Sequence, residues 1–439
     1  MTRRHAGPSA SRTTRRPPGP VAYTPAWTPA QLPAGIAKIW LRDQLSALRA
    51  LDDGTGDLDG LSDSSTLGQW SEVGGNHLRQ ATSGSRPYVG YHPKGGVAVA
   101  GDGVARSMRS ISSVSGGQII WAAAAVVGPN LLRNTEPAEP AAFASQYQTL
   151  AANDAIANPA SAFLVGEQYT NRWMQTSGLE GTYYRDGSVV SPADVGPQRV
   201  WEVHEYERNA AANAGNFLLF RYPGNQFYWL GASREFLVTS TAISVEDRAR
   251  VRAYFARHRR GPLLVCTGDS LVAGRLVNNH EAWPSVLWTD WRRALSVANV
   301  GVPGQTSAQM VSGDPAKLAA LAGEHTSRTV LVAIGANDLL NGLTDTLSNL
   351  EAYTTAANAA GWRVIWTSVA PASLYSGPQN TARLAFNAAA AAGWAAAGAA
   401  GFVDIAAVAP EVGGDGIHWT AAGHAAVAAA VAPVAIDLL

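Results

Sequence analysis

The sequence contains little cysteine, little charge and no long apolar run. Its single cysteine, Cys266, excludes a disulfide framework within the chain. Charged residues make up 15% of the 439 positions, and the 33 basic residues balance the 33 acidic ones. No overall field therefore favours nucleic acid or an anionic membrane. Because no stretch of 18 uncharged apolar residues occurs, we expect no membrane-spanning helix.

The chain is rich in apolar residues, which make up 46% of it and indicate a well-packed globular protein. Because 439 residues exceed one ordinary core, we predict two domains, at 23–258 and 259–439, preceded by a basic flexible arm at 1–22. The arm contains five arginines, and no apolar segment follows it, so it lacks the pattern of a secretion signal. We expect it to contact neighbouring chains of an assembly, and hence an oligomer.

The first predicted domain is composed of short alternating segments separated by Gly, Asn, Asp and Ser. Residues 117–127, 217–222 and 227–230 are examples, and many short strands of this kind predict an all-β sandwich. Near its end, residues 244–257 have helical spacing. Ser244 is suited to cap that helix, with Asp247 three residues later.

Two groups of motifs occur in this half. The first group is Ile39–Asp43, Leu67–Ser71, Gly74–His77 and Arg86–Pro87, and the second is Phe236–Val238 leading into the Ser244 helix. In this order they resemble the motifs of the concanavalin A-like and laminin G-like jelly-roll domains. The resemblance implies a lectin-type β-sandwich that binds glycans or acts as a spacer, and a fold of this kind does not decide between the two.

Two further features of this half could bind ligands, and each has a simpler interpretation. Six tryptophans could stack on sugar rings, although tryptophans on strands more often belong to the core. The acidic loop at 52–59 could hold Ca²⁺, but it lacks the glycine of an EF-hand loop, and a solvated turn is favoured. The tryptophans are Trp40, Trp70, Trp121, Trp173, Trp201 and Trp229.

The second half changes period, because apolar runs alternate with longer helix-like segments. This pattern predicts an α/β domain with a parallel sheet, in a flavodoxin-like three-layer arrangement. Cys266 lies in the first apolar run, where we expect a buried side chain. The predicted strands are 263–266, 296–299, 329–334, 363–367 and 402–405, and the predicted helices are 283–293, 308–322, 345–360, 381–397 and one from 421.

Polar motifs follow four of these predicted strands, where a parallel sheet places its ligand site. Gly268-Asp269-Ser270 follows the first strand and a segment ending at Gly304 follows the second. Asn337 follows the third, and a loop with Asp415 and His418 precedes the last helix. In this order the motifs resemble those of the SGNH, or GDSL-type, hydrolases, and all five family positions match. The resemblance implies ester hydrolysis.

The chemistry of these residues agrees with that resemblance. A serine hydroxyl becomes a nucleophile when a base takes its proton, so we expect Ser270 to attack and His418 to act as base, oriented by Asp415. The negative oxygen that develops then needs donors. The backbone N–H groups of Ser270 and Gly304 and the side-chain amide of Asn337 are the candidates for this oxyanion hole.

Each assignment has a structural alternative. Ser270 could cap a helix, Gly304 could only permit a turn, and Asn337 could belong to a capping turn with Asp338. Asp269 could hold the loops around Ser270 by hydrogen bonds. His424 lies on the predicted last helix, where a packed or surface histidine is favoured over a catalytic one.

The second domain is short and lacks a long apolar insertion that could form a lid, so small acyl groups are favoured. We therefore expect a carbohydrate O-acetyl esterase that acts on an acylated polysaccharide, is guided by the lectin-like domain and needs neither metal nor cofactor. The alternative is a virion-associated fibre, spike or tail protein whose esterase domain is accessory or inactive. Either protein would be extracellular or virion-associated. A large separation of Ser270 from His418 would favour the inactive alternative.

Overall fold

The computed structural model describes residues 27–33, 36–41, 48–49, 69–70, 78–92, 96–100, 108–110, 119–126, 147–153, 162–167, 172–174, 181–189, 201–208, 217–219, 231–239, 241–277, 280–291, 294–323 and 325–439. The predicted arm at 1–22, the acidic loop at 52–59 and Trp229 lie outside these residues, as do the side chains of Trp121 and Trp173. The predictions on those positions therefore stay predictions.

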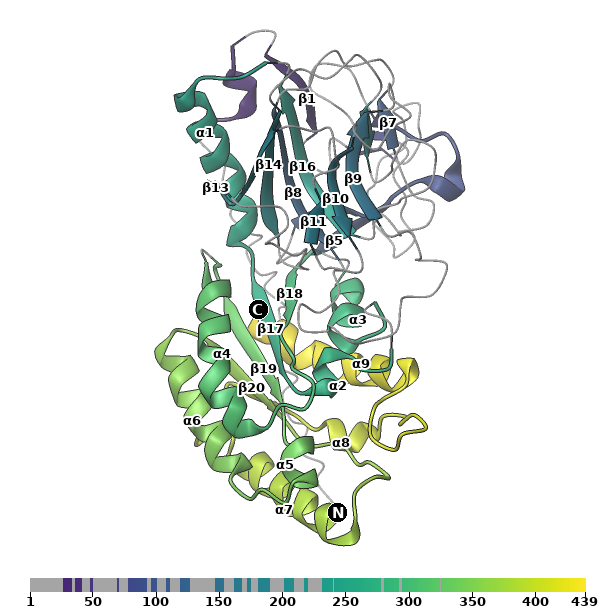
Figure 1. Ribbon diagram of the computed structural model, residues 1–439, viewed down its shortest axis with the longest axis vertical. Helices are drawn as coiled ribbons and strands as arrows, with labels where there is room; N and C mark the ends of the chain where they lie inside the picture. The colour runs from purple at the N-terminus through teal and green to yellow at the C-terminus, as the bar shows by residue number, and fades with distance from the viewer. Residues whose placement is uncertain are drawn as a thin grey trace, which may run out of the picture.

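The first half of the chain, called the β region below, contains two antiparallel sheets (Figure 1). In the first sheet the neighbouring strands are β13 (Ser188–Val189), β12 (Gly181–Arg185), β14 (Glu202–Arg208), β8 (Ile119–Val126), β16 (Gly231–Thr239), β6 (Gly96–Ala100) and β5 (Tyr88–His92), with β1 (Ala37–Leu41) also paired to β16. In the second they are β11 (Arg172–Met174), β10 (Ala162–Glu167), β9 (Tyr147–Asn153), β15 (Phe217–Leu219), β7 (Met108–Ser110), β4 (Leu78–Arg79), β3 (Gln69–Trp70) and β2 (Leu48–Arg49).

The two sheets contact each other through aromatic side chains. Trp70 of β3 and Phe236 of β16 meet edge to face with ring centroids 6.2 Å apart. Trp40, Trp70 and Trp201 are all buried, so these three belong to the core and not to an exposed sugar platform. The described strands of the β region pair in antiparallel sheets, which is compatible with the predicted all-β sandwich, and the jelly-roll connectivity stays a prediction.

Helix α1 (Val245–Phe255) closes the β region and begins at the predicted residue. The Ser244 hydroxyl caps it by accepting a hydrogen bond from the Asp247 N–H at 3.0 Å. Val251 and Phe255 of α1 are buried against the first sheet in a cluster with Leu237. The short helix η7 (Ala256–Arg260) then leads into the parallel sheet, so the predicted domain boundary at 258/259 falls inside η7 and stays a prediction.

The second half contains a five-stranded parallel sheet in the order β18-β17-β19-β20-β21, which is the flavodoxin-like order. The strands are β17 (Leu263–Gly268), β18 (Ser296–Asn299), β19 (Arg328–Ala333), β20 (Arg363–Thr367) and β21 (Gly401–Val403). The predicted strand at 402–405 extends too far, because the Asp404 side chain caps helix α8 (Ile405–Val408) by accepting from the Ala407 N–H.

Helices cover both faces of this sheet because its strands are apolar on both sides. Along β17, Leu263 and Val265 pack with α4 (Ser307–Ala322), α6 (Thr346–Ala359) and α7 (Gly377–Gly393). Leu264 and the buried Cys266 pack with α3 (Trp283–Asp290) and α9 (Ala421–Leu438). The predicted three-layer α/β domain is therefore confirmed. Helix α7 begins four residues before the predicted start, because Ser376 caps it by accepting from the Gln379 N–H.

Helix α9 is the one helix among the described residues that is long and apolar enough to span a membrane, with a mean hydropathy of 1.6 over 18 residues. In the structure its apolar side chains Val427, Ala428, Val431 and Ala435 are buried in the core. These side chains form the face of α9 that packs against α3 and the sheet, and 33% of the 18-residue window is buried.

The β region contacts the end of the parallel sheet at which its strands begin. The Trp201 N–H donates to the Ser296 hydroxyl at 3.2 Å, and Arg234 donates to the Ala294 carbonyl at 2.6 Å. The Arg234 guanidinium also lies 4.1 Å from the Trp201 ring centroid. Six residues of β17 extend about 20 Å at about 3.3 Å per residue, so these contacts lie far from the carboxyl ends of the strands.

Candidate active site

Ser270 lies where β17 ends and turns into the short helix α2 (Ser270–Ala273). The turn depends on Gly268, whose φ is +149° and whose absent Cβ would lie 1.8 Å from the Ala333 carbonyl oxygen. A side chain at this position would force β17 away from β19. Asp269 caps α2 by accepting from the Leu271 N–H at 2.9 Å. The residue that caps the helix is thus Asp269, and the Ser270 hydroxyl remains available for chemistry.

Asp415 and His418 share one loop, which an antiparallel bridge between Val412 and Trp419 closes. Inside the loop the Gly413 N–H donates to the His418 carbonyl at 2.7 Å. One carboxylate oxygen of Asp415 accepts from the backbone N–H of His418 at 3.0 Å, and the other contacts the Nδ1 of its imidazole. The three-residue spacing therefore lets one carboxylate hold both the backbone and the ring of His418.

The loop delivers the His418 imidazole to Ser270. The distance from Nε2 to the Ser270 Oγ is 2.9 Å, between residues 148 positions apart. Because Asp415 faces Nδ1, it favours the tautomer with the proton on Nδ1 and the lone pair of Nε2 toward the serine. Partial burial alone would raise the pKa of Asp415, but the hydrogen bonds from the His418 side chain and backbone lower it to about 2. Asp415 therefore stays ionised at neutral pH.

The three predicted oxyanion donors follow β17, β18 and β19. In the part of the chain that the structure describes, the N–H groups of Ser270 and Gly304 donate to no protein acceptor. Gly304 has a φ of +79°, and a Cβ there would meet no atom within 4 Å, so its backbone faces open space. The Asn337 amide donates one proton to the Gln305 carbonyl at 3.0 Å, and its second proton remains for an oxyanion.

Two buried carboxylates support the loops around these donors. Asp338 accepts from the Ser307 N–H at the start of α4 and from the Ser307 hydroxyl, at 3.1 and 2.5 Å. It therefore braces the start of α4, whose N-cap is Thr306. Asp338 itself lies inside the short helix α5 (Ala336–Leu340), whose N-cap is Gly335. Burial raises the pKa of Asp269 to about 7; the bond from Leu271 opposes this rise, and the Asp338 carboxylate adds to it. Asp269 thus holds the nucleophile turn by hydrogen bonds, as predicted.

The remaining sequence candidates lie outside this arrangement. His424 is fully buried, with its ring 5.4 Å from that of Trp419, so the packed interpretation is confirmed. Trp283, at the start of α3, is buried in the core. Among the described residues no group of three His, Cys, Asp or Glu could hold a metal ion.

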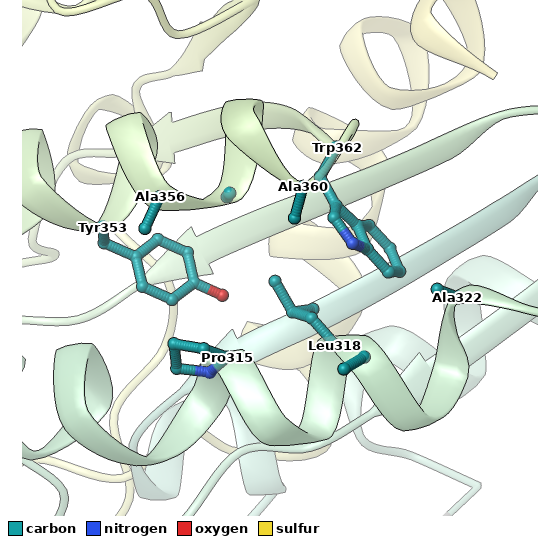
Figure 2. A pocket seen from close by; sticks show the side chains of 9 residues that line it. Pro315, Leu318, Ala322, Tyr353, Ala356, Ala360 and Trp362 are labelled. Carbon is teal, nitrogen blue, oxygen red and sulfur yellow. The ribbon is translucent and has the colours of Figure 1, made fainter.

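An apolar cavity of about 290 Å³ lies between α4 and α6, on one face of the sheet (Figure 2). Pro315, Leu318, Tyr353 and Trp362 line it together with several alanines, and none of the predicted site residues does. The cavity is therefore separate from the Ser270 arrangement.

The sequence analysis did not predict a role for two residues near the oxyanion donors, Gln305 and Asp314. Gln305 directly follows Gly304, and its backbone carbonyl orients the Asn337 amide. Asp314 is fully buried on α4 between the core residues Met310 and Leu318. An acidic residue at the spacing of an apolar helix face was the signal that could have revealed it.

The α/β domain matches a known protein family. Residues 266–426 match the GDSL-like lipase/acylhydrolase family. The α/β domain is a GDSL-type hydrolase domain. The matched segment of this domain, called the GDSL domain below, contains Ser270, Gly304, Asn337, Asp415 and His418. The amino-terminal β region lies outside that segment.

A curated relative of the GDSL domain is thioesterase 1/protease 1/lysophospholipase L1 of Escherichia coli strain K12, 42% identical over 79 residues. That match covers 18% of this chain and 36% of the relative, and the protein of the same name from E. coli O6:H1 matches equally. The chain thus spans about a third of the length of these relatives.

Solved structures similar to the GDSL domain include a lipolytic protein of the G-D-S-L family from Desulfitobacterium hafniense. It is 19% identical, covers 40% of this chain and 99% of its own, and has a TM-score of 0.34. An acetyl xylan esterase variant from Geobacillus stearothermophilus is 15% identical, covers 40% of this chain and 94% of its own, and also has a TM-score of 0.34.

Proposed function

We propose that the chain is a serine ester hydrolase in which Ser270 is the nucleophile, His418 the base and Asp415 the residue that orients the base. The observation that carries this proposal is the 2.9 Å contact of the Ser270 Oγ with the His418 Nε2, with Asp415 on the opposite ring nitrogen. This is the geometry in which a histidine activates a serine.

The reaction follows from these positions. As the Ser270 Oγ attacks the ester carbonyl carbon, His418 takes its proton, and the carbonyl oxygen becomes negative between the N–H groups of Ser270 and Gly304 and the Asn337 amide. His418 then gives the proton to the departing alkoxide, which leaves an acyl-enzyme. Water attacks the acyl carbon with His418 again as base, and the carboxylic acid and free Ser270 are released.

For the substrate we propose small acyl groups, acetyl above all, on a carbohydrate. Residues 259–439 contain no long apolar insertion of the kind that forms a lipase lid. Gly304 is exposed, and a Cβ there would meet no atom within 4 Å, which supports the approach of a bulky polymer to this position. The E. coli relative has thioesterase and lysophospholipase in its name, which supports transfer of an acyl group to water as the reaction class.

The position of the β region bears on how it would guide the enzyme to its polysaccharide. The described contacts of the β region lie at the amino ends of the parallel strands, about 20 Å from Ser270. We therefore propose that the β region holds the polymer as an anchor and does not form a wall of the active site. Full-length Ser270→Ala protein should then bind acetylated and deacetylated polysaccharide about equally, and binding that depends on acetylation would contradict the anchor.

A chain-length series tests the activity. We expect the full chain to hydrolyse p-nitrophenyl acetate faster than the butyrate and octanoate esters, and to release acetate from acetylated polysaccharide. Ser270→Ala should lower kcat roughly 10⁴- to 10⁶-fold. Ser312→Ala, an exposed serine on α4, is the matched control and should retain full activity. Full activity of Ser270→Ala would refute the nucleophile, and preference for octanoate would refute the small acyl group.

A second proposal, a receptor-binding component of a virion, concerns the setting of the enzyme. The sequence argument for an inactive esterase required a large separation of Ser270 and His418, and the 2.9 Å contact favours an active one. The assembly itself stays a prediction, because the basic arm lies outside the described residues.

A further inference from the structure

Asp314 is a fully buried carboxylate on the sheet-facing side of α4. Its position between Met310 and Leu318, one turn away on either side, is one that an apolar residue normally occupies. A carboxylate in the core costs free energy unless donors satisfy it. Since an apolar residue would fill this position at a lower cost in free energy, we expect a role of the Asp314 carboxylate in its hydrogen bonds.

The donors around Asp314 come from three different elements. The Thr267 hydroxyl of β17 donates to one carboxylate oxygen. The Gln305 side-chain amide donates to the other at 3.1 Å, and the Lys317 ammonium does so at 2.7 Å. Asp314 thus connects the loop after β18 to β17, the strand that leads to Ser270.

Gln305 is the link from Asp314 to the proposed oxyanion hole. It directly follows Gly304, and its backbone carbonyl accepts the Asn337 side-chain amide at 3.0 Å. Its backbone N–H closes the preceding turn onto the Val302 carbonyl at 3.1 Å. Its own side chain is buried, and the bond to Asp314 is the hydrogen bond that holds it.

We propose that Asp314 is a positioning residue for the oxyanion hole, which acts by holding Gln305 so that Gly304 and Asn337 aim their donors at one point. This inference rests on the proposed ester hydrolysis at Ser270. Donors placed before the reaction begins lower the barrier, and displacement by about 1 Å can cost about 10²-fold in rate. Asp314 itself touches no substrate.

A variant at Thr267 distinguishes the effect of Asp314 on kcat from its effect on the free energy of unfolding. Thr267→Val removes the hydroxyl that Asp314 shares with β17 but leaves the Gln305 contact in place. Asp314→Ala removes both of these contacts and also the contact with the Lys317 ammonium. Both variants should lower the free energy of unfolding, whereas only Asp314→Ala should lower kcat, by about tenfold to hundredfold, with KM changed less than about twofold.

Gln305→Ala removes the donor of the hydrogen bond between Gln305 and Asp314. It should therefore lower kcat as Asp314→Ala does. The double variant Asp314→Ala/Gln305→Ala should lose little more than either single variant. Asp314→Asn keeps an oxygen for the Gln305 amide and should recover most of kcat. If Asp314→Ala does not fold, Gln305→Ala and Asp314→Asn still decide the question.

The experiment measures kcat and KM on p-nitrophenyl acetate together with urea unfolding for these full-length variants. Equal loss of kcat in Thr267→Val and Asp314→Ala, or unchanged kcat in Gln305→Ala, would overturn the proposal. In the Ser270→Ala background, the NMR signal of the Asn337 side-chain amide should shift with Gln305→Ala and not with Thr267→Val. This readout needs no turnover, so a failure of the proposed esterase activity is distinguished from a failure of the positioning role.

Discussion

The two halves of the chain bury charge in different ways. Where α1 covers the β region, the fully buried Glu235 contacts Arg257 at 2.5 Å, His258 at 2.7 Å and the Tyr254 hydroxyl at 2.9 Å. In the GDSL domain, the buried carboxylates at the carboxyl end of the sheet are satisfied mainly by backbone N–H groups, hydroxyls and amides. Asp269 and Asp338 are of this kind.

The difference separates a structural use of buried charge from a functional one. The partners of Glu235 are Trp40 of β1, which donates at 2.6 Å, and residues of α1 and η7. Its network therefore fixes the helix that leads from the β region to β17. The partners of Asp269 and Asp338 lie on the loops that carry the proposed catalytic groups. A break in the first network should therefore change stability alone, whereas a break at the second should change the rate.

Among the variants that test this difference between the two networks, we expect the largest effect from Glu235→Ala. It leaves Arg257 partly buried without its carboxylate, and removal of one partner of a buried pair costs about 3–5 kcal/mol. We expect the free energy of unfolding, measured in urea, to fall by about that amount while kcat on p-nitrophenyl acetate stays the same at a temperature where the variant is folded. A parallel fall in kcat would show that the two networks are coupled.

Asn337→Ala should have the opposite effect, with a lower kcat and a nearly unchanged free energy of unfolding. It removes a proposed oxyanion donor, and such a loss costs about 2.7–4 kcal/mol in the transition state, or about 10²–10³-fold in kcat. Asn337 is partly exposed, so the unfolding free energy should change little. Asn341→Ala is the matched control, because the Asn341 side-chain amide donates to the backbone carbonyl of Asn337 and is not a proposed oxyanion donor. A normal kcat in Asn337→Ala would remove this residue from the oxyanion hole.

The third effect is spread over several pH units and is a change in the pH dependence of stability caused by Asp269. Burial raises its pKa from an ordinary 3.8 to about 7. Between about pH 4 and 7 the unfolded chain has therefore lost a proton that the folded chain keeps. Stability from this group is complete below pH 4 and falls as pH rises, by about 1.4 kcal/mol per pH unit. Asp269→Asn should remove that decline.

The measurement is urea unfolding of both proteins at intervals from pH 4 to 8. The difference in unfolding free energy between Asp269→Asn and the parent should increase with pH up to about 7 and then level off. A difference that is independent of pH would mean that Asp269 is ionised in the folded chain.

Much of the GDSL domain followed from local patterns. The predicted strands 296–299 and 363–367 have the observed bounds, because short apolar runs in a parallel sheet are bounded by polar turns. Errors occurred where a cap decides the boundary, as at Ser376 for α7 and Asp404 for α8. One side-chain hydrogen bond shifts such a boundary by several residues, and apolar periodicity does not reveal it.

The proposed site was predictable to the same degree. Ser270, Gly304 and Asn337 follow successive parallel strands, and such strands end at the same edge, so their proximity follows from the chain order. Gln305 and Asp314 were missed because their importance lies in contacts between segments. Nothing in the local pattern shows that the Asp314 carboxylate reaches Gln305, nine residues away, and Thr267, 47 residues away.

The sequence by itself therefore determined the parallel α/β domain, the order of its motifs and the residue types suited to acyl transfer, since these depend on periodicity and on short spacings such as Asp415 to His418. Only the tertiary structure decided that the Ser270 hydroxyl meets the His418 ring, that Asp314 holds Gln305, and that the β region contacts the opposite end of the sheet. These relations join residues distant along the chain, and packing alone sets the distances between them.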